Sequence, residues 1–302
     1  MEDPYSKVLR ECSETGSISG LVELALTQDA KFIVNTVESL RARGWRRFAQ
    51  QLLTELATQH EVRKVPSIAA ELKVADYDDH ARGMLTGFGG RRTPGEVADL
   101  VELLMRAGAR DYADVVLSTA KERRPARDVA QLLSVLTQRE RPWAVATGSS
   151  THSERWCRSH EFVADIFLEF DRMGFRDGVS LFRTHVGEVG GQPDILELCE
   201  ALKVRGLGRE RESCLTWAGV FSIKYVQQAF RDERISKEDF EVVVRSAVAE
   251  SSERSLRYLV NGMGEEVATA VRDIISTYGL TPGLGATELE VTFGLVADTS
   301  DT

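Results

Sequence analysis

The side chains best suited to hold a metal ion are His152, Cys157 and His160, which fall within nine residues of one another. Imidazole and thiolate are common zinc ligands, but a structural zinc site takes four of them. The nearest further candidates, His185 and Cys199, are remote in sequence. We therefore interpret the stretch as a polar loop followed by a buried cysteine, and the sequence predicts neither a metal nor a cofactor.

Motifs for common enzymatic reactions are absent from the sequence. It contains no G-x-x-x-x-G-K-[ST] phosphate loop, no G-x-S-x-G elbow and no H-E-x-x-H motif. The glycine-rich run 87–90 (GFGG) follows a helical pattern without the strand that precedes a dinucleotide-binding turn, so we interpret it as a turn. The sequence favours a non-enzymatic protein. An enzyme whose catalytic groups meet only in the folded chain is the weakest alternative.

Arginines recur in clusters at similar intervals along the chain. Guanidinium groups pair with carboxylates and stack on aromatic rings, so a row of them would suit an acidic partner peptide. Arginine near a helix C-terminus also complements the helix dipole while staying in solvent, and this second interpretation is favoured. Asp76, Asp78 and Asp79 interrupt the row. The candidate partner-binding residues are Arg43, Trp45, Arg46, Arg47, Arg106, Arg110, Arg172, Arg176, Arg205 and Arg209.

Large apolar residues recur with a period of about 32 residues, a length typical of helical-hairpin repeats, and one interval is slightly longer. These repeat anchors are Leu40, Leu72, Leu104, Leu136, Phe170 and Leu202. Each ends an apolar stripe with helical spacing. Four residues later stand Gly44, Asp76, Gly108, Glu140, Gly174 and Gly206, where glycine suits the left-handed residue after a helix. A second helix follows, and Thr93-Pro94-Gly95-Glu96 reads as the start of the next hairpin.

The period predicts an all-α fold, an α-solenoid of about 32-residue helical hairpins, because such hairpins bury their apolar faces by stacking on one another. We expect an N-terminal capping segment (1–29), a first array (30–146), a polar loop or hinge (147–157), and a second, acidic array with capping helices (158–280). The last segment, 281–302, differs from the repeats.

The C-terminal tail has a strand-like pattern over 288–296. Leu289, Val291, Phe293 and Leu295 alternate with other residues, and they complete the set of candidate partner-binding residues. A lone strand needs a partner, so we expect it to pair with a second subunit or with a sheet edge on another protein. Packing on the final helices is the alternative.

Charge and composition narrow the classes of partner. Basic and acidic residues balance over 1–150, so the whole net charge of −9 lies in the second half of the chain. This acidity disfavours binding to nucleic acid, which depends on clustered Lys and Arg. No apolar run long enough to span a membrane and no secretory signal are present, and the four cysteines are widely spaced. We expect a cytoplasmic protein without membrane contact.

The hairpin unit, with a glycine turn followed by FAQQLL or YADVVL, resembles the repeats of the tetratricopeptide and pentatricopeptide superfamily over about residues 30–215. The resemblance is one of design, and the Arg- and Ala-rich units look most like actinobacterial α-solenoids. The resemblance carries no specific function, but a solenoid offers an extended binding surface, so we expect a scaffold or adaptor that binds other proteins, as a subunit of a larger bacterial assembly. The alternative is a reader of single-stranded RNA or DNA, in which turn arginines and Trp45, Tyr77, Trp143 and Phe175 would contact phosphates and bases.

Overall fold

The computed structural model describes residues 4–139, 159–175, 194–221, 226, 228–230, 232–249 and 265–278. Within these ranges the chain forms helices and turns and no β-strand, which confirms the all-α prediction. The loop 147–157 and the tail with Leu289, Val291, Phe293 and Leu295 lie outside the described residues. The expected hinge, the tail strand and its pairing therefore stay predictions.

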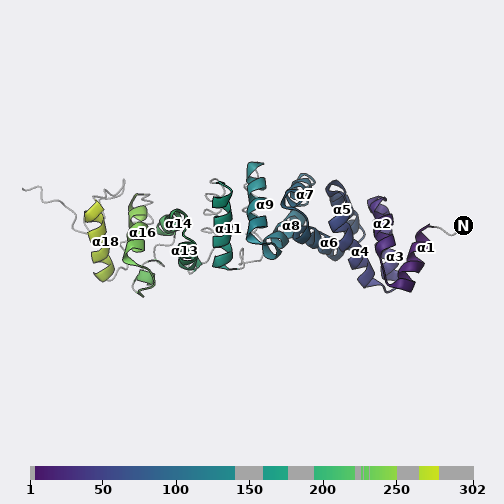
Figure 1. Ribbon diagram of the computed structural model, residues 1–302, viewed down its shortest axis with the longest axis horizontal. Coiled ribbons are helices and arrows are strands. Elements are labelled where there is room, and N and C mark those ends of the chain that lie inside the picture. The colour runs from purple at the N-terminus through teal and green to yellow at the C-terminus, as the bar shows by residue number, and fades with distance from the viewer. Residues whose placement is uncertain are drawn as a thin grey trace, which may run out of the picture. The chain divides into compact units, whose positions relative to one another are not determined.

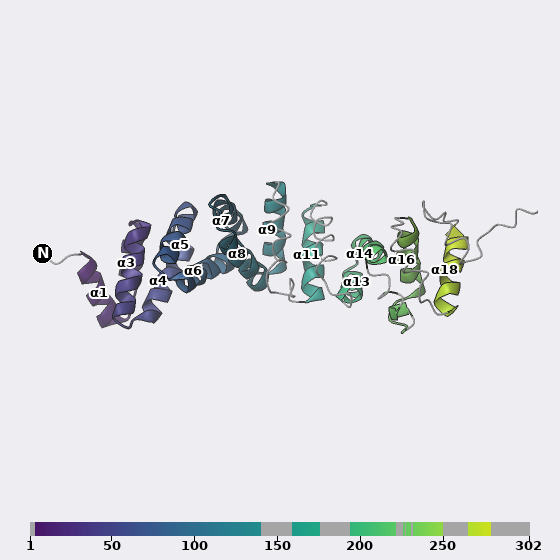
Figure 2. The same cartoon turned by 180° about the vertical axis from the view of Figure 1, so that it is seen from behind.

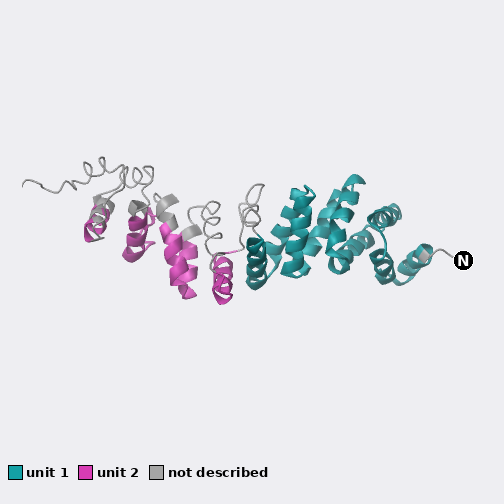
Figure 3. Ribbon diagram, turned by 90° about the horizontal axis from the view of Figure 1, so that it is seen from above, with its two compact units in different colours: residues 1–152 teal, residues 153–302 magenta. Residues whose placement is uncertain are grey.

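The chain divides into two compact units, residues 1–152 and 153–302, coloured separately in Figure 3. Unit 1 contains three successive helical hairpins, flanked by helices at both ends. Its helices are α1 (Pro4–Thr15), α2 (Ser19–Leu26), α3 (Ala30–Ala42), α4 (Arg46–Gln59), α5 (Val65–Val74), α6 (Asp78–Arg91), α7 (Pro94–Arg106), α8 (Arg110–Arg123) and α9 (Ala126–Gln138), with a short 3-10 helix η1 (Val62–Lys64) before α5.

The hairpins of unit 1 stack so that equivalent helices lie next to one another. The second helices α4, α6 and α8 pack in series, and the first helices α3, α5, α7 and α9 form a parallel series beside them. Figure 1 shows α5 and α7 in one row and α4, α6 and α8 in the other, and Figure 2 shows the same arrangement from behind. Unit 1 is therefore a two-layered helical array.

Unit 2 repeats the same pattern over the part that the structure describes. Helix α13 (Asp194–Val204) forms a hairpin with α14 (Gly208–Phe221), and α11 (His160–Arg172) packs on α13. Helix α16 (Lys237–Ala249) packs on α14, and α18 (Glu265–Tyr278) on α16. None of the described helices in either unit is long and apolar enough to cross a membrane.

The repeat anchors and the turns that follow them take the predicted places. All six anchors are at most 1% exposed. In the α3–α4 turn, Gly44 adopts a φ of 78°, and the N–H of Trp45 donates to the Leu40 carbonyl at 2.8 Å, a Schellman cap. The residues at the equivalent position with positive φ are Asp76, Gly108, Gly174 and Gly206; Glu140 lies outside the described residues.

The same cap recurs beyond Leu202, the last repeat anchor. Glu233 has a φ of 54°, and the N–H of Arg234 donates to the Ala229 carbonyl at 2.8 Å. At the predicted start of a new hairpin, Thr93 and Glu96 form a capping box at the beginning of α7. The hairpin repeat therefore follows from local hydrogen bonding as well as from stacking.

One prediction of local structure is wrong. Residues 87–90 do not form a turn but lie inside α6, which runs from Asp78 to Arg91. The reason is tertiary packing: a Cβ atom on Gly89 would lie 2.6 Å from the backbone oxygen of Val116 in α8. Without a side chain at Gly89, α6 approaches α8 closely, and stacking outweighs the low helix propensity of glycine.

Candidate functional site

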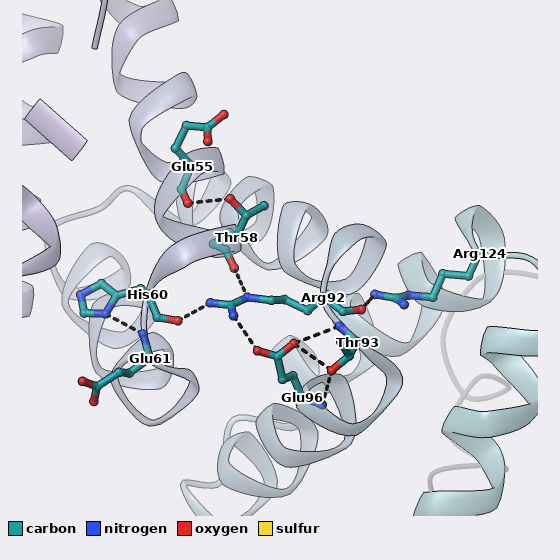
Figure 4. Close-up of polar contacts among 9 residues, drawn as sticks. Glu55, Thr58, His60, Glu61, Arg92, Thr93, Glu96 and Arg124 are labelled. Atoms are coloured by element: carbon teal, nitrogen blue, oxygen red, sulfur yellow. Dashed lines mark hydrogen bonds and ion pairs between the residues drawn. The ribbon is translucent and has the colours of Figure 1, made fainter. Parts of the chain in front are cut away.

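A half-buried arginine joins the first two hairpins of unit 1. Arg92, just after α6, donates from Nε to the carbonyl of Ala57 at 3.0 Å and from Nη2 to the carbonyl of His60. These carbonyls lie at the C-terminal end of α4, where helical carbonyls lack partners within the helix. Nη1 also pairs with Glu96 in the first turn of α7 at 2.6 Å. Figure 4 shows the guanidinium held between these groups.

The contact recurs one repeat later with Arg124. Its Nε donates to the carbonyl of Gly89 at 2.7 Å, its Nη2 donates to the carbonyl of Arg92, and its Nη1 lies 3.5 Å from Asp128. The Arg124 side chain is only 5% exposed. Burial lowers its pKa and Asp128 counteracts this, but arginine stays charged at neutral pH. We call Arg92 and Arg124 the stapling arginines.

The row of turn arginines predicted from the sequence does not include the stapling arginines, which directly follow the second helix of a hairpin. Arg92 and Arg124 are separated by one full repeat, and His60 occupies the same position one repeat earlier. Glu96 and Asp128 also share a repeat position. The recurrence of an arginine and an acidic residue at equivalent repeat positions is visible in the sequence alone, and it indicates a contact that repeats between hairpins.

A second type of ion pair links successive first helices. Arg139 reaches Asp99 at 2.7 Å in unit 1, and Arg205 reaches Asp165 at 2.7 Å in unit 2. The two pairs have the same separation in sequence and occupy the same positions relative to the repeat anchors. Arg205, a candidate partner-binding residue, thus connects two helices of its own unit.

The other candidate arginines of the hairpin turns differ in their surroundings. Arg43 donates to the Ser39 carbonyl at 3.1 Å, Arg106 pairs with Glu102 at 2.5 Å and Arg172 with Glu169 at 2.5 Å. Trp45 is half-buried, with its ring edge-on to Phe48. The remaining members within the described ranges are exposed: Arg46, Arg47, Arg110 and Arg209. Arg176 lies outside these ranges, so the row of arginines as a binding surface stays a prediction.

Only one member of the metal-like cluster, His160, lies in the part of the chain that the structure describes. His160 Nδ1 lies 2.9 Å from Glu197, whereas His152 and Cys157 lie outside the described residues. Cys199 is a buried free thiol, and burial raises its pKa. No group of three metal-binding side chains occurs in the part of the chain that the structure describes.

A compact polar cluster connects α6 and α8. The Tyr112 hydroxyl donates to Asp78 at 2.5 Å, and Arg82 Nε donates to the other oxygen of the same carboxylate at 2.7 Å. Burial and the hydrogen bond to Asp78 raise the pKa of Tyr112. The phenol therefore stays protonated at neutral pH, as suits a structural hydrogen bond and not a catalytic base.

A hollow of about 470 Å³ opens over α6, on the face of this helix that points away from the core. Its floor is formed by Gly83, Thr86, Gly87 and Gly90. The spacing of three and four residues places these residues on one face of α6. The opposite face carries buried residues such as Met84 and Phe88, so the hollow lies outside the core.

The walls of the hollow come from the neighbouring second helices. Gln50 and Thr54 of α4 form one side, and Arg123 of α8 forms the other, with Arg91 at the C-terminal end of α6. Both arginines are exposed, and neither forms an ion pair with a described residue. No acidic residue lines the hollow. Its charge is therefore positive, in contrast to the chain as a whole.

Helix packing does not account for all the glycines of α6. A Cβ atom on Gly87 would lie 3.6 Å from Ala57, and one on Gly90 would lie 3.7 Å from Arg123, both ordinary contacts. Each glycine inside a helix costs about 0.5–1 kcal/mol relative to alanine. Close packing thus requires Gly89, whereas Gly87 and Gly90 are not required by packing and keep side chains off their part of the floor of the hollow.

Another hollow, of about 650 Å³, lies beside η1 and α7, and its charges are balanced within the chain. Asp99 and Glu102 line it and are contacted by Arg139, and Glu102 also pairs with Arg106, another lining residue. A charged ligand there would have to compete with these ion pairs. The hollow over α6 is therefore the better candidate for a binding site.

The buried His60 predicts a pH-dependent stability. Its side chain accepts a hydrogen bond from the Glu61 N–H at Nδ1 (2.9 Å), so the ring is neutral with its proton on Nε2. Burial lowers the pKa of His60, Lys64 lowers it further, and Glu61 raises it by less than Lys64 lowers it, with the smallest effect coming from Arg92, which lowers it. The unfolded chain takes up a proton below about pH 6.5, whereas the folded chain resists it. The contribution of neutral His60 to the free energy of unfolding is therefore fully present above about pH 6.5 and is lost as the pH falls below this value.

Urea unfolding at pH 7.5 and 5.5 checks this expectation. For the wild type, His60 contributes a loss of up to about 1.4 kcal/mol over this range. His60→Asn, whose side-chain oxygen can accept the Glu61 N–H, should show a smaller loss. His80, whose pKa is lowered mainly by burial, acts in the same direction and remains in both proteins. An equal pH dependence of the two proteins would contradict the assignment.

Over the residues that the structure describes, the fold and the site define a class of protein: an all-helical array of repeated hairpins with a positively charged hollow on the second-helix layer of unit 1. Comparisons with protein-family models, with curated proteins and with solved structures found no match.

Proposed function

We propose that this chain is a non-enzymatic helical-repeat adaptor that binds another protein through the second-helix layer of unit 1. The observation that carries the proposal is the hollow over α6, because core packing does not require the glycines Gly87 and Gly90 of its floor. Stacked hairpins present extended surfaces suited to protein partners. The likeness to tetratricopeptide and pentatricopeptide repeats supports the same kind of function.

Free cysteines support a cytoplasmic location for this adaptor within a larger bacterial assembly. Cys12 and Cys199 are buried and form no disulfide. Reduced thiols are typical of cytosolic proteins.

The structure offers little support for the alternative of a single-stranded nucleic-acid reader. Such readers need aromatic rings free to stack on bases. The Tyr77 ring is covered by Arg41 at 4.6 Å, and Phe175 packs against Phe170 with ring centroids 5.6 Å apart. Trp45 packs edge-on against Phe48. Three of the four aromatic candidates are thus used in contacts within the chain, and Trp143 lies outside the described residues.

A pulldown with the intact tagged chain tests the adaptor function. Extract from the native cells should yield a protein that forms a complex of defined stoichiometry with the chain when both are purified, as measured by light scattering. Nuclease treatment should leave this complex intact. Capture that disappears with nuclease would favour the nucleic-acid alternative, and the absence of any reconstituted complex would contradict the proposal.

A further inference from the structure

We propose that the hollow over α6 binds an acidic α-helix of the partner protein. This inference rests on the proposed adaptor function and adds the chemistry of the partner. It depends on three properties of the hollow, namely its direction, its glycine-rich floor and its charge.

The direction of the hollow suits a helix. Gly83, Gly87 and Gly90 follow one another along the axis of α6, and the hollow is bordered by α4 and α8 on either side. Side chains of one helix normally fit into grooves between those of the next, and small residues allow the closest approach. A helix laid along α6 would therefore meet a floor of three glycines and Thr86, with the Gln50 side chain beside Gly83, and a wall on each side.

The floor disfavours an extended peptide. Strand-like binding depends on hydrogen bonds to free backbone groups of the receptor. Gly83, Gly87 and Gly90 lie within α6, whose backbone groups bond to one another along the helix. An extended segment would leave its own N–H and C=O groups without partners there, whereas a helix satisfies its own.

The charge of the hollow selects acidic side chains. Arg91 and Arg123 occupy equivalent positions in successive repeats, near the C-terminal ends of α6 and α8. The Arg123 stem lies beside Gly90, since a Cβ atom on Gly90 would be 3.7 Å from Arg123 Cδ. With no acidic residue in the lining, both guanidinium groups are available to carboxylates of a bound helix.

A displayed library of single helices provides the probe. One face of each helix is fixed as alanine and serine, the remaining positions are randomised, and binders are selected on the intact chain. We expect the selected helices to be enriched in Asp and Glu. Affinities are then measured by fluorescence anisotropy with the best selected helix as a synthetic peptide.

Two groups of variants locate the binding site. Gly87→Leu places a side chain over the floor, with its Cβ at ordinary contact distance from Ala57, and should weaken binding at least about tenfold, a clear change in Kd. Arg91→Ser with Arg123→Ser should weaken it at least about fivefold and reduce its salt dependence. Gly95→Leu is the matched control, because Gly95 has no neighbour within 4 Å and does not line the hollow. Thermal melting by circular dichroism confirms that each variant is folded.

Several results would overturn the inference. These are the recovery of no binding helix, selected helices without acidic enrichment, or binding that survives Gly87→Leu. Association of the wild-type chain with itself, abolished by Gly87→Leu, would instead assign the hollow to a second copy. A natural partner that still binds Gly87→Leu would reject this site and leave the adaptor function standing on another surface.

Discussion

Replacing Arg124 with methionine should lower the free energy of unfolding by about 3 kcal/mol, whereas Arg123→Met should change it by less than about 0.5 kcal/mol. Arg124 is 5% exposed and donates to the carbonyls of Gly89 and Arg92. Methionine fills most of the same volume but donates no hydrogen bond, so these acceptors lose their partner. Arg123 is exposed and serves as the neighbouring control. Urea unfolding of the intact chain, followed by circular dichroism, measures both.

The position of Arg124 also predicts which helices lose local stability first in the Arg124→Met protein. Its hydrogen bonds join the end of α6 to the segment between α8 and α9, so their loss should first lower the amide protection of α8 and α9 in hydrogen exchange. Protection of α3 and α4, which belong to an earlier hairpin, should change less. Equal stabilities of the Arg124→Met and Arg123→Met proteins would show that water replaces the arginine and that the staple adds no net stability.

The parts of the fold that the sequence predicts are those governed by local rules. Leu104 and Gly108 illustrate this: an apolar stripe ends at the anchor, and four residues later the chain needs a positive φ that glycine adopts at low cost. Asp76 occupies the equivalent repeat position and has the same geometry, although aspartate is a weaker signal by itself. A period combines many weak local signals into one strong prediction.

The parts that the sequence did not predict depend on neighbouring hairpins. The turn predicted at 87–90 is wrong because the proximity of α8 to Gly89 decides its conformation. The hollow over α6 was not predicted either, since it depends on which face of α6 the stacking leaves outside. The stapling arginines are different, because the repeat register already placed Arg92 and Arg124 at equivalent positions.

The glycines of α6 should respond to alanine substitution with opposite signs. Gly89→Ala should lower the free energy of unfolding by about 2 kcal/mol, because its methyl group would meet the Val116 carbonyl oxygen at 2.6 Å and push α6 from α8. Gly87→Ala and Gly90→Ala should each raise it by about 0.5–1 kcal/mol, since their methyl groups fit and alanine favours the helix. Urea unfolding of the three single variants measures these signs under identical conditions.

The same three variants separate stability from function. Gly89→Ala should also disturb the hydrogen bond from Arg124 to the Gly89 carbonyl. The double variant Gly89→Ala with Arg124→Met should therefore lose less stability than the sum of the losses in the two single variants. Gly87→Ala should give a more stable chain with a shallower hollow and weaker binding of an acidic helix, the trade-off expected where a site is kept open at the expense of stability. If Gly87→Ala instead lowers the free energy of unfolding, packing requires this glycine. Its presence would then give no evidence that the hollow is kept open for a ligand.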